Sequence, residues 1–244
     1  MKMQYVIRHY QPSDKELIVP LYRLVVKEQA YSAFRRVMRR PDYICVTLSV
    51  CVMGYILGGS SSACALLAGG AWAGLVYYCC RDVYRGYIRK NLSSGLADVP
   101  SFLRERPDAG FWLAEAELAG GLQIVGMVAV AGKSDGGGGG GGGGADGRDG
   151  GGATERRAEL HYLIVAPWCR RTGLGSRLVQ TVLHFCRERR FARVVLETTS
   201  AHTAAIALYR GMGFVHTLTH SSTASSRWVT GLSGVTALQL EHEL

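Results

Sequence analysis

A short segment in the second half of the chain combines arginines with closely spaced glycines. Its residues are Arg170, Arg171, Thr172, Gly173, Leu174, Gly175 and Ser176. The apolar run Leu160–Val165 before it has the pattern of a strand, and apolar residues after it recur at helical spacing. Glycines let the main chain approach an anion closely, and the first turn of a helix offers unpaired N–H groups and the positive end of its dipole. The segment therefore predicts a site for phosphate groups.

Two common nucleotide-binding motifs do not describe this segment. The P-loop motif GxxxxGK(S/T) does not occur in the chain. The dinucleotide fingerprint GxGxxG would need a third glycine where this chain has Leu178, and the arginines precede the loop. By itself the segment indicates a ligand with phosphate groups without identifying it.

A longer stretch around this segment resembles the acetyl-CoA motif of the GNAT superfamily of N-acetyltransferases. The residues that carry the resemblance are Val165, Pro167, Arg170, Arg171, Gly173, Leu174, Gly175 and Leu178, followed by Val195–Thr198 and Ala207–Phe214. Within the superfamily, an arginine-flanked apolar hairpin and the segments Leu96–Val99 and Phe111–Glu115 are similar to the camello family. That family includes cysteine-S-conjugate and aspartate N-acetyltransferases. The resemblance covers nearly the whole chain except a glycine-rich insert and the C-terminal end.

The resemblance implies an α/β (α+β) fold, with a mixed central sheet whose two central strands splay apart between flanking helices. It implies acetyl-CoA as the co-substrate and no metal. The pantetheine arm would lie along the strand residues Leu163, Ile164 and Val165. The diphosphate would lie on the amides of Arg171, Thr172, Gly173, Leu174, Gly175 and Ser176, and Arg170 and Arg171 would add positive charge. His202 stands where many superfamily members carry an asparagine next to the pantetheine.

Three residues are candidates for proton transfer. Tyr209 matches the family's thiol-protonating tyrosine, and a phenol with a pKa near 10 can donate to a coenzyme A thiolate. The alternative for Tyr209 is an aromatic ring packed behind its helix. Glu159 and His161 alternate on the strand beside the co-substrate, and either could take a proton from the amine or be a polar residue facing solvent.

The acceptor is a small-molecule amine, for which the resemblance favours a cysteine S-conjugate. Aspartate and protein lysine side chains are the alternative acceptors. The alternative to an enzyme is a catalytically inactive membrane module that binds acetyl-CoA. A carboxylate on the acceptor would be bound by an arginine, and Arg104, Arg106 and Arg227 are all available. The sequence does not choose among them.

A long apolar stretch lies far from the glycine segment. From Tyr43 to Cys80 the chain has no charged side chain, and Gly58–Ser62 in its middle predict a turn between two arms. Arginines flank both ends, namely Arg35, Arg36, Arg39 and Arg40 before it and Arg81, Arg85 and Arg89 after it. Since both flanks favour the cytosol, we expect a hairpin that enters the bilayer and returns. A single span with a lumenal C-terminal domain is the alternative.

Composition agrees with a membrane-associated enzyme. Charged residues make up only 19% of the chain, and the net charge of +9 is concentrated beside the apolar stretch. This placement predicts contact with membrane lipid and argues against nucleic-acid binding. The seven cysteines lack metal-ligand spacing, so they are expected to be reduced thiols, and Cys169 is assigned to packing. Met1–Gln11 has no apolar run of signal-peptide length.

We expect the protein on the endoplasmic reticulum or another internal membrane, with its catalytic domain in the cytosol. The chain is expected to divide into three regions. Residues 1–40 would form an N-terminal strand at Gln4–Arg8 and a helix capped by Asp14, with Leu17, Leu21, Leu24 and Val25 on its buried face. Residues 41–82 would form the membrane hairpin. Residues 83–244 would form the acetyltransferase domain, with strands at 111–117, 123–131, 160–165 and 193–198, helices at 178–190 and 203–212, and a disordered glycine-rich loop at 134–154.

Overall fold

The computed structural model describes residues 4–96, 98–106, 108–118, 121–133, 156–220 and 227–244. Its strands are β1 (Tyr5–His9), β2 (Gly110–Leu118), β3 (Gly121–Lys133), β4 (Arg157–Val165), β5 (Arg193–Thr199), β6 (Val215–His220) and β7 (Ala237–Glu243). Its α-helices are α1 (Lys15–Val37), α2 (Pro41–Leu57), α3 (Ser62–Asn91), α4 (Val99–Glu105), α5 (Leu174–Glu188), α6 (Thr203–Gly211) and α7 (Arg227–Ser233). Short helical turns lie at η1 (Pro12–Asp14), η2 (Leu92–Leu96) and η3 (Pro167–Cys169).

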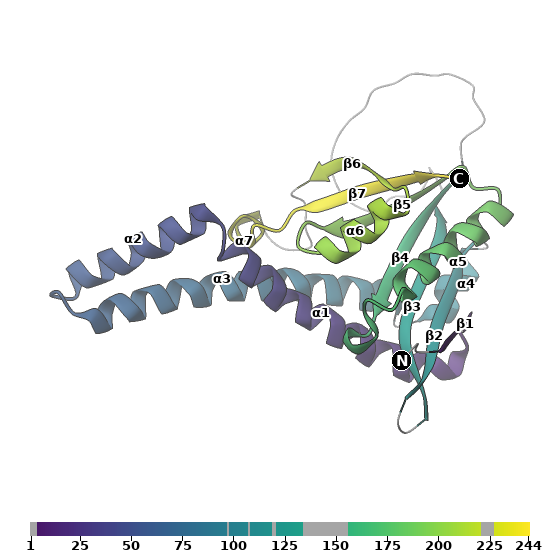
Figure 1. Cartoon of the computed structure of the whole chain (residues 1–244), viewed down its shortest axis with the longest axis horizontal. Coiled ribbons are helices and arrows are strands. Elements are labelled where there is room, and N and C mark those ends of the chain that lie inside the picture. Colours follow the sequence, from purple (N-terminus) through teal and green to yellow (C-terminus); the bar gives the residue numbers. More distant parts are fainter. Residues whose placement is uncertain (1–3, 97, 107, 119–120, 134–155, 221–226) are drawn as a thin grey trace, which may run out of the picture.

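The strands form one mixed sheet in the order β1-β2-β3-β4-β5-β7-β6 (Figure 1). Neighbouring strands run antiparallel throughout the described sheet except β4 and β5, which pair in parallel. The expected mixed sheet between helices is thus confirmed. The expected strands and helices from residue 111 to residue 212 are all present, whereas the predicted disordered loop at 134–154 lies outside the described residues.

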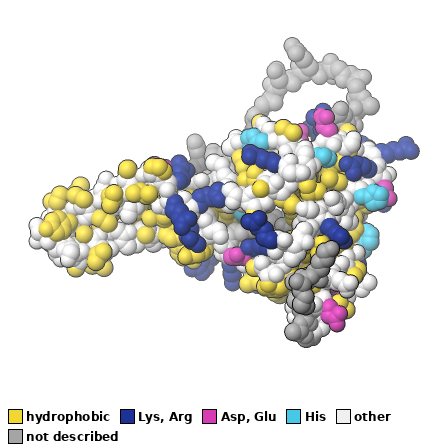
Figure 2. All heavy atoms as spheres, in the orientation of Figure 1, with side chains coloured by type: hydrophobic (Ala, Val, Ile, Leu, Met, Phe, Trp, Pro, Cys, Tyr) yellow, Lys and Arg dark blue, Asp and Glu magenta, His cyan; other side chains and the backbone are white. Residues whose placement is uncertain are grey.

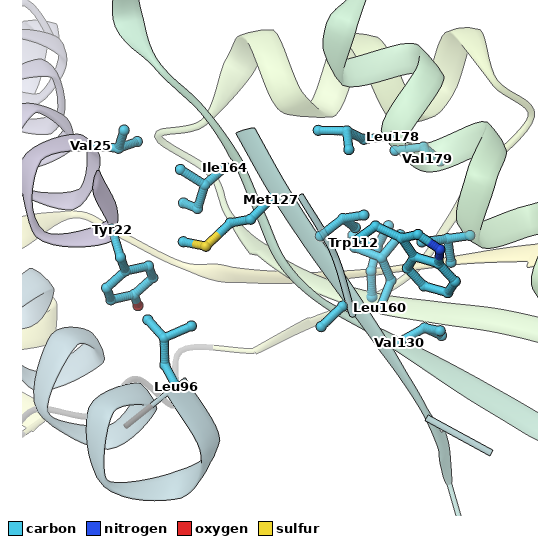
Figure 3. Packing of buried hydrophobic residues seen from close by; sticks show 14 of the residues in the cluster. Tyr22, Val25, Leu96, Trp112, Met127, Val130, Leu160, Ile164, Leu178 and Val179 are labelled. Carbon is cyan, nitrogen blue, oxygen red and sulfur yellow. The ribbon is translucent and has the colours of Figure 1, made fainter. Parts of the chain in front are cut away.

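The sheet is covered on both faces. Helix α5 packs against β2, β3 and β4, and α1 packs against β3 and β4. Figure 3 shows Met127 and Ile164 between Tyr22 and Val25 of α1 and Leu178 of α5. Burial of these apolar side chains supplies the main stabilisation of the fold.

The start of α1 differs from the sequence prediction. Asp14 does not cap the helix with its side chain. Its carboxylate accepts two hydrogen bonds from Arg8 of β1, at 2.7 and 2.8 Å, and one from the Gln11 amide at 2.8 Å. The Arg8 guanidinium also donates to Glu115 of β2 and holds the pKa of Asp14 below its usual value. Asp14 therefore ties the first strand to the helix that follows.

The predicted buried face of α1 is half wrong. Leu21 and Val25 are buried, but Leu17 and Leu24 are exposed, and Ile18 is buried in their place. Tyr22, Val26, Ala30 and Ala33 complete the buried face. Helix α1 packs against both the sheet and α3. Its buried face is therefore wider than the predicted one and includes Ile18 in place of Leu17.

Helices α2 and α3 form an arm that projects from the body (Figure 1). The chain turns back at residues 58–61, where the sequence predicts a turn. The two helices approach closely at small residues: a Cβ added at Gly54 would lie 2.6 Å from the Ala68 Cβ, and one added at Gly69 would lie 2.5 Å from the Cys51 Sγ. Small side chains at such contacts are typical of helix pairs in membranes.

The surface of the arm is apolar and its base is basic. None of the residues of α2, all of which the structure describes, is buried. Exposed apolar side chains cover both helices, including Leu48, Val52, Ile56, Leu57, Leu66 and Leu67. Figure 2 shows Lys and Arg side chains gathered where the arm joins the body. By length and composition α3 could cross a membrane, and α1 with α2 would count as a second span only if that pair, bent by 77°, acted as one.

The arm is continuous with the body through α3. The expected boundary at residue 82 falls inside this helix, which runs on to Asn91. Its C-terminal half packs against α1 and α7 and brings Tyr84 and Tyr87 to the sheet. The sequence does not predict β6, α7 or β7, and β7 lies between β5 and β6 in the sheet.

Candidate active site

The two central strands separate partway along the sheet. Among the described residues, β4 and β5 pair over Arg157–Leu160 and Arg193–Leu196. Beyond Leu160, β4 continues to Val165 without pairing with β5. The opposite edge of β4 stays paired with β3, since Gly126 faces Val165 and Met127 faces Ile164. Residues 161–165 therefore present one main-chain edge that β5 does not occupy. Leu163, Ile164 and Val165, the residues expected to hold the pantetheine arm, lie on this stretch.

A bulge marks the point of separation. Between Met127 and Ala129 one residue of β3 opposes two of β4, and one of these two, Tyr162, has a left-handed backbone with φ of 55°. A non-glycine residue in this region costs about 1 kcal/mol. The ring centroid of Tyr162 lies 6.3 Å from that of Tyr22, and 6.4 Å from those of Phe102 and Phe111, so packing holds the strained residue. No sequence signal marks this bulge, because tyrosine is a residue that favours regular strands.

The glycine segment forms an open loop at the start of α5. Arg171 and Gly173 both have left-handed backbones, with φ of 65° and 83°, and α5 begins at Leu174. Among the described residues, the amides from Arg171 to Ser176 donate no hydrogen bond to the protein. Successive free amides at the positive end of a fifteen-residue helix are suited to a diphosphate. The loop thus fits the group that the sequence predicts for Arg171, Thr172, Gly173, Leu174, Gly175 and Ser176.

Arg170 is engaged differently from its neighbours. Its guanidinium makes two hydrogen bonds with the Glu28 carboxylate of α1, at 2.9 and 2.8 Å. Its amide donates to the Pro167 carbonyl at 3.4 Å. The side chain therefore ties the loop to α1, and the amides that remain open begin at Arg171.

His202 lies at the end of β5, at the N-terminus of α6. Its Nδ1 is 3.3 Å from Thr198 Oγ1, and its Nε2 is 3.5 Å from the Tyr84 hydroxyl. Burial lowers the pKa of His202 to about 4, and the charge of Arg170 adds to this effect. The ring is therefore neutral at physiological pH and can both donate and accept a hydrogen bond.

Tyr209 lies on α6 and is 5% exposed. Its ring meets Phe214 edge-on at 5.5 Å, and among the described residues its hydroxyl makes no hydrogen bond. Burial raises the pKa of the phenol, so the hydroxyl keeps its proton over the physiological range. Such a group can donate a proton but cannot act as a base.

Glu159 and His161 lie together on β4, next to the bulge. The Glu159 Oε1 and the His161 Nδ1 are 4.0 Å apart. The His161 ring stands edge-on to Phe102 of α4 at 6.1 Å, and the Arg106 guanidinium lies 5.0 Å from the centroid of that same Phe102 ring. The structure thus brings the two candidate bases together, and the candidate arginine Arg106 contacts the same ring as His161.

Several tyrosines that the sequence did not single out border the same region. Tyr22 accepts a hydrogen bond of 2.6 Å from the Asn91 amide, and Tyr84 lies 3.3 Å from Thr199 Oγ1. Their spacing within α1 and α3 is ordinary for helix cores, so nothing in the sequence separates them from packing residues. Cys169 and Cys186 are buried thiols that form no disulfide, and burial raises the pKa of Cys186 to about 12.

Comparison with known proteins identifies the fold family. The sequence pattern of the acetyltransferase (GNAT) family matches residues 78–214, more than half of the chain. The chain belongs to the GNAT acetyltransferase family. It is an acetyl-CoA-dependent N-acetyltransferase.

The relatives of this GNAT acetyltransferase include full-length mammalian proteins. It is 30% identical to mouse N-acetyltransferase 8B, over 87% of this chain and 83% of the relative. It is 29% identical to human N-acetyltransferase 8, over 86% and 84% of the two chains, and 29% identical to mouse N-acetyltransferase family 8 member 7, over 87% and 85%. These camello-like relatives cover the apolar arm as well as the sheet.

The loop geometry predicts a specific effect of substituting Gly173. Alanine there must adopt the left-handed backbone, so Gly173→Ala should destabilise the loop by about 1 kcal/mol and weaken coenzyme A binding several-fold. Isothermal titration with coenzyme A measures this loss. Gly211→Ala, on α6 with nothing within 4 Å of the added Cβ, is the matched control and should bind normally. Equal affinities for the two variants would contradict the assignment.

The burial of His202 predicts a dependence of stability on pH. Its folded pKa of about 4 lies below the usual 6.5, so the unfolded state binds more protons between these values and stability falls as pH falls through that window. Between about pH 7 and pH 5 the loss from this residue is about 2 kcal/mol. Thermal unfolding of His202→Asn should show a shallower decline over the same interval. A decline as steep as that of the native protein would show that His202 is not the group responsible.

Proposed function

We propose that this enzyme transfers the acetyl group of acetyl-CoA to the amino group of a small amino-acid derivative, a cysteine S-conjugate in the first instance, while anchored to an internal membrane. The observation that carries the proposal is the separation of β4 from β5 beside a loop of open amides. Together they offer a main-chain edge and, after a short turn of the chain, an anion site. A phosphate-bearing thioester with an extended arm matches that arrangement.

The chain's own residues divide the binding task. The amides of Arg171 to Ser176 hold the diphosphate, and the free edge of Leu163–Val165 holds the amide groups of the pantetheine arm. His202, neutral and held by Thr198 and Tyr84, borders the gap from the side of β5. When bound, acetyl-CoA supplies the thioester carbonyl that the amine attacks directly.

Proton transfer falls to the residues on either side of this gap. The acceptor arrives as an ammonium ion and must lose a proton, which His161 or Glu159 accepts at the bulge of β4. Tyr209, whose hydroxyl keeps its proton, donates to the departing thiolate. The 4.0 Å between Glu159 Oε1 and His161 Nδ1 exceeds a hydrogen bond, so the two groups are alternative acceptors of this proton.

The apolar arm supports a membrane location. Its exposed surface would be stabilised by lipid, and the arginines at its base suit anionic head groups. Helix α2 has 17 residues and is about 25 Å long, shorter than the roughly 30 Å of a bilayer core. We therefore favour a hairpin that enters from the cytosolic face of the endoplasmic reticulum or a similar membrane and returns. An amphipathic acceptor such as a cysteine S-conjugate partitions to the same surface.

The acceptor and the role of Tyr209 can be tested together. Purified enzyme is incubated with labelled acetyl-CoA and S-benzylcysteine, aspartate or a lysine peptide, and we expect transfer chiefly to S-benzylcysteine. Tyr209→Phe should lower kcat by about 100-fold with little change in coenzyme A affinity, whereas Tyr31→Phe, on an exposed part of α1, should leave both unchanged. Preferred transfer to aspartate or to the lysine peptide would show that the proposed acceptor is wrong. No transfer to any of the three, with coenzyme A still bound, would show an inactive binding module in place of an enzyme.

Membrane insertion of the arm predicts a selective effect of added charge. Val52→Lys together with Ile56→Lys places two charges on exposed apolar positions of α2, each costing about 2.5–3.5 kcal/mol at the centre of a bilayer. The double variant should be released from microsomes by alkaline carbonate, while the native protein stays bound. The control pair is Leu122→Lys with Val215→Lys, exposed apolar positions outside the arm. Release of both pairs, or protease protection of the C-terminal domain in sealed microsomes, would argue against the cytosolic hairpin.

A further inference from the structure

Arg106 and the candidate base His161 contact the same aromatic ring, that of Phe102. We infer that Arg106 binds the carboxylate of the acceptor, so that the enzyme selects amines that carry a carboxylate next to the amino group. This inference rests on the proposed function and names one specificity-determining residue for it. The sequence alone left three arginines as equal candidates.

The position of Arg106 is set by a rigid neighbour. Phe102 is 5% exposed, and its helix α4 begins at Asp98, whose carboxylate accepts hydrogen bonds from the amide and the hydroxyl of Ser101. The Arg106 guanidinium lies 5.0 Å from the Phe102 ring centroid, a distance typical of a cation–π contact. Because the ring is buried and its helix is capped, the guanidinium is held over a fixed surface.

Phe102 also contacts one of the two candidate bases. His161 lies 6.1 Å from the Phe102 ring, edge-on, and Glu159 lies 4.0 Å from His161. The same ring therefore contacts a guanidinium and one member of a carboxylate–imidazole pair. An α-amino acid carries its ammonium and its carboxylate on the same carbon, and each group reaches about 2.8 Å further through a hydrogen bond. Such a zwitterion can place its ammonium toward Glu159 and His161 and its carboxylate toward Arg106.

The other arginines near this face are engaged elsewhere. Arg170 forms its two hydrogen bonds with Glu28, and Arg8 is bound by Asp14 and Glu115. Arg104 and Arg106 are both exposed, and the charge of Arg104 acts on the Asp98 carboxylate. Among the described residues Arg106 forms no ion pair with a carboxylate. Its planar guanidinium can bind a carboxylate through two parallel hydrogen bonds.

The test compares one acceptor with and without its charge. Native enzyme, Arg106→Gln and Arg104→Gln are assayed with S-benzylcysteine and with S-benzylcysteine carboxamide, at saturating acetyl-CoA. We expect the native enzyme to prefer the acid, and Arg106→Gln to raise KM for the acid by about 10- to 100-fold with little change in kcat. Its KM for the carboxamide should stay near that of the native enzyme. Arg104→Gln, two residues before Arg106 in the last turn of α4, is the matched control and should leave both values unchanged.

The possible outcomes distinguish a wrong role for Arg106 from a wrong assignment of the acetyltransferase activity. An equal rise in KM for acid and carboxamide in Arg106→Gln, or no preference for the acid in the native enzyme, overturns the role of Arg106 and leaves the acetyltransferase activity standing. Absence of acetyl transfer to every amine overturns the proposed function and this inference with it. Arg106→Lys keeps the charge and loses the planar fork, so it should recover part of the acid preference. If Arg106→Gln fails to fold, an unchanged acid preference in Arg106→Lys, Arg106→Met or both counts against a carboxylate contact.

Discussion

The parting of β4 from β5 is the constraint around which the rest of this molecule is arranged. Each strand keeps one satisfied edge, β4 against β3 and β5 against β7, while their facing edges diverge after Leu160 and Leu196. An unsatisfied buried backbone group costs about 1–3 kcal/mol, so a gap of this kind persists only where something polar completes it. The bulge at Tyr162, the ring of His202 and the amides before α5 all border this gap. A ligand with an extended polar arm is the natural complement.

The strain at the gap is supported from outside the sheet. Tyr162 keeps a left-handed backbone because rings from α1, α4 and β2 surround it, and Arg170 is held by Glu28 of α1. The N-terminal helix thus contacts both the bulge and the anion loop. Asp14 and Arg8 fix the start of that helix to β1, and Glu115 joins them from β2. Residues distant in the chain therefore determine the shape of a site whose binding groups are mostly main-chain atoms.

The parts of the site that follow local rules could be predicted from the sequence, and the parts that depend on tertiary packing could not. The strand, glycine turn and helix from Leu160 onward follow from periodicity and from the backbone freedom of Gly173. The position of Asp14 predicts a helix cap. In the structure its carboxylate binds the Arg8 guanidinium of β1, which is a stronger partner than a helix amide. The buried face of α1 differs from the predicted one because the helix packs against both the sheet and α3. The place of β7 between β5 and β6 depends on long-range pairing, for which a short alternating run near a chain end carries little local signal.

Helix α3 is one uninterrupted rod from the tip of the arm to Tyr84 and Tyr87. Each residue of an α-helix advances the side-chain direction by about 100°. Inserting or deleting a single residue within the apolar part of this rod would swing those tyrosines away from the sheet, together with the contact between Tyr84 and His202. Changes in length can be absorbed only at the bend around residues 58–61. The reach of the arm is therefore adjustable at its far end, while its phase relative to the catalytic domain is not.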